Sequence, residues 1–174
     1  MIQGRIEGLE IHKGSAFLDT RGSFSRLYDS DWFANLKQSP MQVNISRNTY
    51  THTLRGMHFQ LSGKPEHKVL TLLSGDVFLA IVDLRIESNT YLEVAYEMYS
   101  AKSANSIFIP AGCATGWLTL SPNTDIHYVM YSRFEDNAYS GLMYNDPFFK
   151  IPWPDNPKVI SEQDKNWPLF SIES

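Results

Sequence analysis

The sequence has little of what disulfide-bonded, membrane-spanning or nucleic-acid-binding proteins need. Cys113 is its single cysteine, so no disulfide can form within the chain. This cysteine usage, together with an N-terminus unlike a signal peptide, predicts a reducing, cytoplasmic setting. No apolar run approaches the roughly 18 residues of a membrane span. Lys and Arg total 15 against 19 Asp and Glu, a net charge of −4, which argues against nucleic acid as a general partner.

The chain also lacks internal repeats, low-complexity tracts, linkers and long helical patterns. Its 174 residues are therefore expected to form one domain, residues 1–174, with room for a sizeable core. Short strands separated by turn residues are expected at 5–18 (with a turn at 13–15), 41–47, 53–60, 68–73, 77–84, 91–99, 106–109, 115–120 and 126–131. This pattern predicts an all-β sandwich or barrel rather than a parallel sheet.

Helical structure is expected in only two short places. Residues 30–36 form the better candidate, with Ser30 as its N-cap, and residues 161–164 suit a single turn. The tail contains Pro152, Pro154 and Pro157, which predict a coil that wraps the surface.

Histidines fall in no spacing that suits a metal. Metal-binding jelly-roll barrels use a His-x-His pair, followed by a Glu and a later His. Here the first pair reads His58-Phe59-Gln60, and Thr115 stands where the last histidine would be. With two imidazoles missing, we predict that the chain holds no structural or catalytic metal.

The segment from Thr53 to Gln60 carries the most chemistry. If it forms a strand, alternation places Leu54, His58 and Gln60 on one face, with the last two directed into a cavity. Arg55 would lie on the opposite face, or swing round where the intervening glycine loosens the strand. Histidine titrates near working pH, so His58 is a candidate proton-transfer group; the alternative is an inert, hydrogen-bonded barrel residue.

Nine blocks of residues, in this order and spacing, resemble the dTDP-4-dehydrorhamnose 3,5-epimerase family of nucleotide-sugar epimerases. The resemblance runs from about Gly14 to Leu169. The blocks are Arg21-Gly22-Ser23-Phe24, Gln42-Val43-Asn44, Leu54-Arg55-Gly56-Met57-His58-Phe59-Gln60, His67-Lys68-Val69, Val82-Asp83-Leu84-Arg85, Ile109-Pro110-Ala111-Gly112, Tyr144-Asn145-Asp146-Pro147, Ile151-Pro152-Trp153-Pro154 and Ile160-Ser161-Glu162-Gln163-Asp164.

The resemblance implies a metal-free jelly-roll barrel of the cupin type and a homodimer in which an N-terminal strand pairs across the interface. It implies a nucleotide-linked 4-keto-6-deoxy-hexose as substrate, whose C3 and C5 hydrogens flank the ketone. A base removes one hydrogen to give an enolate, and an acid returns a proton to the opposite face. Such a reaction needs no cofactor, and the implied place of the enzyme is deoxysugar and surface polysaccharide synthesis.

Four residues match the family's catalytic positions. By resemblance His58 is the base, and Asp164 is the carboxylate that orients it and favours the imidazolium formed on proton abstraction. Tyr128 matches the tyrosine acid, and Lys68 matches the lysine that stabilises negative charge on O4. Taken singly, each has an ordinary structural explanation; Lys68, for example, could be solvated beside Glu66.

Other positions match the family's substrate-binding residues. Arg21 and Arg55 correspond to diphosphate-binding arginines, a task that suits guanidinium forks, and Gln42 and Asn44 to nucleotide and sugar contacts. The remaining positions expected to contact substrate are Phe24, Arg26, Gln60, Thr115, Phe134 and Tyr139.

Five residues depart from the family pattern. Thr115 stands where the family usually has His, Arg26 where many members have Glu, and Gln163 where a basic residue commonly precedes the Asp. Phe134 replaces a frequent Tyr, and Tyr139 occupies a position that is often acidic. The resemblance therefore leaves open the nucleotide, the sugar, and whether C3, C5 or both are inverted.

Two alternatives to the epimerase remain open at this point. One is a ketoisomerase, which would use the same enolate to move the carbonyl from C4 to C3. The other is a catalytically silent barrel that binds a nucleotide sugar or a partner protein.

Overall fold

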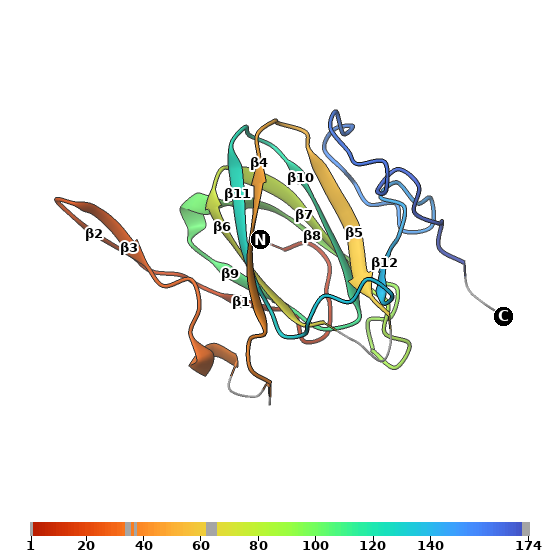
Figure 1. Ribbon diagram of the computed structural model, residues 1–174, viewed down its shortest axis with the longest axis horizontal. Helices are drawn as coiled ribbons and strands as arrows, with labels where there is room; N and C mark the ends of the chain where they lie inside the picture. The colour runs from red at the N-terminus through yellow and green to blue at the C-terminus, as the bar shows by residue number, and fades with distance from the viewer. Residues whose placement is uncertain (1, 34–35, 37, 62–65, 172–174) are drawn as a thin grey trace.

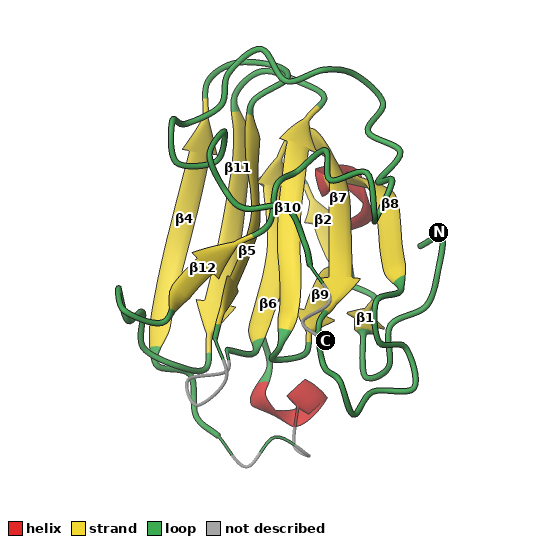
Figure 2. Ribbon diagram, turned by 90° about the vertical axis from the view of Figure 1, so that its right-hand side faces the viewer, coloured by secondary structure: helices red, strands yellow, loops and turns green. Residues whose placement is uncertain are grey.

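The computed structural model describes residues 2–33, 36, 38–61 and 66–171, and it folds as two facing antiparallel sheets. The first sheet has the order β1 (Glu10–His12), β9 (Ser106–Ile109), β6 (Lys68–Ser74), β11 (Thr124–Met130) and β4 (Gln42–Asn48). The second has the order β12 (Tyr139–Gly141), β5 (Leu54–Gln60), β10 (Cys113–Thr119), β7 (Asp76–Asp83) and β8 (Val94–Ser100). The predicted all-β, jelly-roll type of fold is confirmed (Figure 1, Figure 2).

A two-stranded hairpin lies apart from both sheets. It consists of β2 (Ala16–Asp19) and β3 (Gly22–Ser25), and Figure 1 shows it extending away from the barrel. All four residues of β2 are exposed. The hairpin therefore packs against neither sheet of the described chain.

Helical structure within the described residues is limited to two 3-10 helices, η1 (Ser30–Phe33) and η2 (Ala101–Ser103). Of the helix expected over 30–36, residues 30–33 form the 3-10 helix η1, and residues 34 and 35 lie outside the described residues. The N-cap assignment is wrong, because the Asp29 carboxylate, not Ser30, accepts the Asp31 backbone N–H, at 3.1 Å. The turn expected at 161–164 is present, closed by the Lys165 N–H donating to the Ser161 carbonyl.

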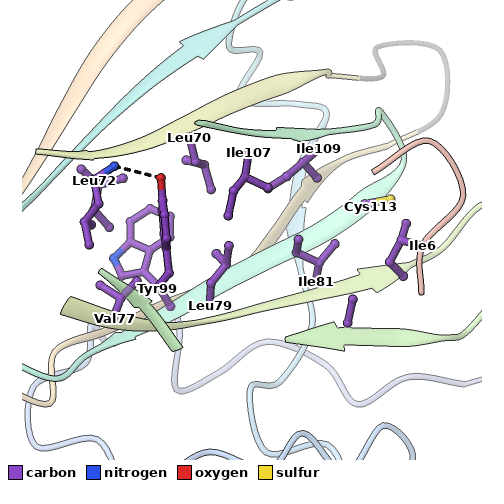
Figure 3. Packing of buried hydrophobic residues seen from close by; sticks show 13 residues of the cluster. Ile6, Leu70, Leu72, Val77, Leu79, Ile81, Tyr99, Ile107, Ile109 and Cys113 are labelled. Atoms are coloured by element: carbon purple, nitrogen blue, oxygen red, sulfur yellow. Dashed lines mark hydrogen bonds between the residues drawn. The ribbon is translucent and has the colours of Figure 1, made fainter. Parts of the chain in front are cut away.

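The core between the sheets fills one end of the sandwich. Leu70 and Leu72 of β6 meet Leu79 and Ile81 of β7 there, and each of these side chains is at most 3% exposed (Figure 3). Cys113 lies in the same cluster, where burial raises the pKa of its thiol to about 12. The thiol therefore stays protonated and serves as a small apolar group.

The C-terminal coil packs on the outer face of the second sheet. Leu54 and Met57 of β5 form a buried cluster with Phe149, against which Trp153 and Ile160 pack. The Leu54 N–H donates to the Val159 carbonyl at 2.8 Å, which ties the coil to the start of β5. This packing brings residues just after 160 beside β5, as Figure 1 shows for the blue C-terminal segment.

Strand β5 does not alternate regularly. His58 lies opposite Thr115 and Arg55 opposite Trp117, with a register shift between the two pairs, so Arg55 and His58 share the inner face. Arg55 therefore swings round, and the expectation that Leu54 shares the His58 face is wrong, because Leu54 packs in the outer cluster. At this shift β5 and β10 approach closely: Gly56 has φ +137°, and a Cβ there would collide with the backbone of Gly116.

Candidate active site

A pocket of about 510 Å³ opens between the two sheets, at the end that the apolar core leaves unfilled. The first sheet contributes two rows of side chains. In one, Met130 of β11 pairs with Lys68 and Gln42; in the other, Tyr128 of β11 pairs with Leu70 and Asn44. The second sheet contributes His58, Thr115, Trp117 and Tyr139. Three of the four predicted catalytic residues thus line one cavity.

Asp164, the fourth, lies directly behind His58. Its Oδ1 is 2.6 Å from His58 Nε2 and also accepts the Trp167 indole N–H at 3.1 Å, while Oδ2 accepts the Gly56 backbone N–H at 3.3 Å. The Asp164 side chain is 5% exposed and that of His58 23%. Burial alone would raise the pKa of Asp164, but the hydrogen bonds and charge of these neighbours outweigh it, and the pKa is lowered.

The ionised Asp164 determines which nitrogen of His58 can act as a base. Because the carboxylate only accepts hydrogen bonds, His58 donates to it through Nε2. Nδ1 then carries the lone pair that can take a proton, and the buried carboxylate stabilises the imidazolium that results.

The space beside Gly141 is needed to hold this arrangement. A Cβ at Gly141 would overlap the indole ring of Trp167, the ring that donates to Asp164. We expect Gly141→Ala to displace Trp167, to lower stability by about 1–3 kcal/mol, and to lower catalytic rate through Asp164. Denaturant unfolding and an activity assay test this, with Ser140→Ala on the same strand as the control. Unchanged stability and activity would contradict it.

Two tyrosines face the pocket from opposite sheets. Burial raises the pKa of Tyr128. The positive charge of Arg55 lowers this pKa and the negative charge of Glu66 raises it, but burial has the largest effect. Burial also raises the pKa of Tyr139, whose ring lies 5.3 Å from that of His58. Both hydroxyls therefore remain protonated and able to donate a proton at neutral pH.

Lys68 is not solvated. Its Nζ lies 3.2 Å from Glu66 Oε1, with side chains 10% and 7% exposed, and both residues line the pocket. Sequence reasoning did not select Glu66 as a site residue. Its place two residues before Lys68, next to the start of the expected strand at 68–73, was the available signal.

Gln60 is buried but does not line the pocket. Its amide donates to Ser132 Oγ at 3.2 Å and to the Arg133 carbonyl at 3.4 Å, and its oxygen accepts the Glu135 N–H at 3.0 Å. The expectation that Gln60 points into the cavity is therefore wrong. It braces the loop after β11, which carries the pocket residue Phe134.

The three expected N-terminal contacts are also remote from the pocket of their own chain. Arg21 pairs with Asp19 at 2.6 Å on the hairpin, with its side chain 88% exposed, and Phe24 is likewise exposed. Arg26 pairs with Asp29 at 2.6 Å. Arg55 lies nearer, donating from Nε to Asn48 Oδ1 at 2.9 Å, and its charge acts on both pocket tyrosines.

Two polar atoms at the inner wall of the pocket have no hydrogen-bond partner in the described part of the chain. They are Thr115 Oγ1 and Trp117 Nε1, both buried.

Within residues 2–33, 36, 38–61 and 66–171, no group of three His, Cys, Asp or Glu side chains is placed to hold a metal ion. No helix among those same residues is long and apolar enough to cross a membrane.

Comparisons with known proteins agree on one family. The family model described as dTDP-4-dehydrorhamnose 3,5-epimerase matches residues 3–171. The epimerase of that name from Methanothermobacter thermautotrophicus is 30% identical, over 95% of this chain and 91% of the relative. The Bacillus anthracis enzyme, solved with TDP and pyrophosphate bound, superposes with a TM-score of 0.89 at 28% identity, covering 98% of this chain and 100% of that one. A Legionella pneumophila epimerase solved with dTDP-4-keto-L-rhamnose superposes with a TM-score of 0.88 at 27% identity. The match covers 97% of this chain and 93% of that one.

Proposed function

We infer the reaction from the family: the chain belongs to the dTDP-4-dehydrorhamnose 3,5-epimerase family, and it is an isomerase. We propose that it inverts C3, C5 or both in a dTDP-linked 4-keto-6-deoxy sugar, without a cofactor. The observation that carries this proposal is the 2.6 Å contact of His58 with Asp164 at a pocket that Lys68 and Tyr128 also line. Family membership favours this reaction over the ketoisomerase and the silent barrel.

Each proposed step has a group of suitable chemistry. His58 Nδ1 removes the proton next to the ketone, and Asp164 stabilises the imidazolium. Lys68 donates to the ketone oxygen as it becomes an enolate, inside a pocket where such a charge contact is stronger than in water. Tyr128 returns a proton to the opposite face; His58 then releases its extra proton to solvent, and the Tyr128 phenolate takes one up, which restores both groups.

Proton NMR of the 4-keto-6-deoxy sugar nucleotide in deuterium oxide tests the reaction. Loss of both the C3 and C5 proton signals would establish a double epimerase, and loss of one a single-site epimerase. Absence of exchange with every dTDP-linked 4-keto sugar offered would contradict the proposal.

Replacing Tyr128 with phenylalanine should separate proton removal from inversion. The base is retained, so deuterium should still enter the substrate, whereas inversion should fall by about 10²–10⁴-fold because the acid on the opposite face is lost. Quantifying both labelled substrate and labelled product by NMR measures this. Equal losses of exchange and inversion would assign Tyr128 a different role.

We also propose that the working enzyme is a homodimer in which the β2–β3 hairpin completes the partner's site. The resemblance implies a dimer with an N-terminal strand at its interface. Support comes from the hairpin's position away from its own barrel and from Phe17, Leu18 and Phe24, which are 66–79% exposed there. Arg21 would then bind the diphosphate in the pocket of the partner.

Mixed dimers test this assembly. Arg21→Ala and His58→Asn chains, each weakly active alone, should recover about one quarter of wild-type activity when co-expressed, because one mixed site in each heterodimer is intact. His58→Asn mixed with Asp164→Asn is the control, since both changes affect the same pocket. No recovery in the first mixture would contradict a contribution of Arg21 across the interface.

A further inference from the structure

Glu66 is an acidic side chain at the pocket that the reaction above leaves without a role. It lines the cavity beside Lys68, is 7% exposed, and its Oε1 lies 3.2 Å from Lys68 Nζ. Burying such a pair costs desolvation that its attraction offsets only in part, so the pair is weak evidence of stabilisation. Its place at the cavity instead allows Glu66 to contact a bound ligand.

The charge of Glu66 limits what it can bind. The proposed ligand carries a diphosphate and develops a negative oxygen during the reaction, and a carboxylate would repel both. An ionised carboxylate accepts hydrogen bonds and donates none, whereas the Lys68 ammonium donates and accepts none. Together the two side chains present one donor and one acceptor, 3.2 Å apart, to the same cavity.

The complement of this pair is an acceptor and a donor on neighbouring atoms. A ketone oxygen only accepts, and a hydroxyl on the next carbon can donate. In a 4-keto-6-deoxy-hexose the neighbour of C4 that carries a hydroxyl is C3, because C5 carries the ring oxygen and the methyl group. A ketone with a hydroxyl at C3 therefore matches Lys68 and Glu66 at once.

We propose that Glu66 is a specificity-determining residue that accepts a hydrogen bond from the C3 hydroxyl while Lys68 donates to the ketone oxygen. This rests on the proposed function, which places the ketone at Lys68. The substrate class follows: 4-keto sugars that retain the C3 hydroxyl are preferred over 3-deoxy sugars.

Titration calorimetry with two ligands tests the assignment. The ligands are the dTDP-linked 4-keto-6-deoxy sugar and its 3-deoxy analogue, measured in a His58→Asn background so that the proposed base does not convert them. With Glu66 present, the hydroxylated ligand should bind at least about tenfold more tightly. Glu66→Ala should reduce this ratio to near one, whereas Glu87→Ala, the same change at an exposed glutamate outside the pocket, should leave it unchanged.

The outcomes separate this inference from the proposed function. Equal ratios with and without Glu66 would overturn the assignment, even if the wild-type protein catalyses exchange. A Glu66-dependent ratio would support it even if the wild-type protein exchanges no hydrogen, a result that would contradict only the proposed reaction. Failure of both ligands to bind while dTDP alone binds would overturn it as well.

Discussion

His58→Asn is expected to lower the rate of hydrogen exchange into the proposed substrate by about 10²–10⁴-fold, the usual contribution of a positioned general base. The asparagine N–H₂ can still donate to the Asp164 carboxylate, but asparagine has no basic nitrogen. The fold and dTDP affinity should persist, because His58 is partly exposed and lies outside the three buried core clusters. Exchange followed by NMR and dTDP titration by calorimetry measure the two quantities.

A second histidine provides the matched control. His52 Nε2 lies 3.5 Å from Asp155, a His–Asp contact outside the pocket, and its φ of 59° is one that asparagine tolerates. His52→Asn should therefore leave exchange within about twofold of wild type, since substitutions away from a functional site have small effects. An equal loss in both variants would indicate a general structural defect and would contradict the assignment of His58 as the base.

Asp164→Asn is expected to reduce exchange by about 10²–10⁴-fold as well, by analogy with carboxylates that orient a catalytic histidine. The amide carries no charge to stabilise the imidazolium. Its N–H₂ can also donate to His58 Nε2, which would move the ring proton to Nδ1 and remove the lone pair that takes the substrate proton. The pH dependence of the residual rate checks this, and near-wild-type exchange in a folded variant would contradict it.

The same substitution has a consequence for stability against acid. The pKa of Asp164 is lower in the folded chain than its ordinary value of 3.8, so the folded state binds fewer protons at this group than the unfolded state does. The contribution is therefore present above pH 3.8 and is lost as the pH falls through the lowered folded pKa. Urea unfolding of wild type and Asp164→Asn should give a stability difference that shrinks on acidification. A difference that grows at low pH would contradict the sign.

Several features of this protein follow from local sequence. Alternating apolar residues and turn signals determine most strands, because a strand with one buried face requires that period. Gln60 and Thr115 stand where a metal-binding barrel has histidines, so the residue types alone argue against a metal. Resemblance pairs His58 with Asp164, and the structure places them in contact across 106 residues of chain.

Tertiary packing decided the rest, and the reason is that these features depend on contacts between distant segments. The register of β5 shifts where Gly56 closely approaches Gly116, and the shift turns Arg55 toward the inner face and Leu54 toward the C-terminal coil. Gln60 is drawn into hydrogen bonds with the loop after β11, and no local pattern records that loop's position. Glu66 becomes a pocket residue because it lies just before β6, where the chain borders the pocket between the sheets. The hairpin that carries Arg21 extends away from its own barrel. Its apolar side chains are therefore exposed and pack on neither sheet of the described chain.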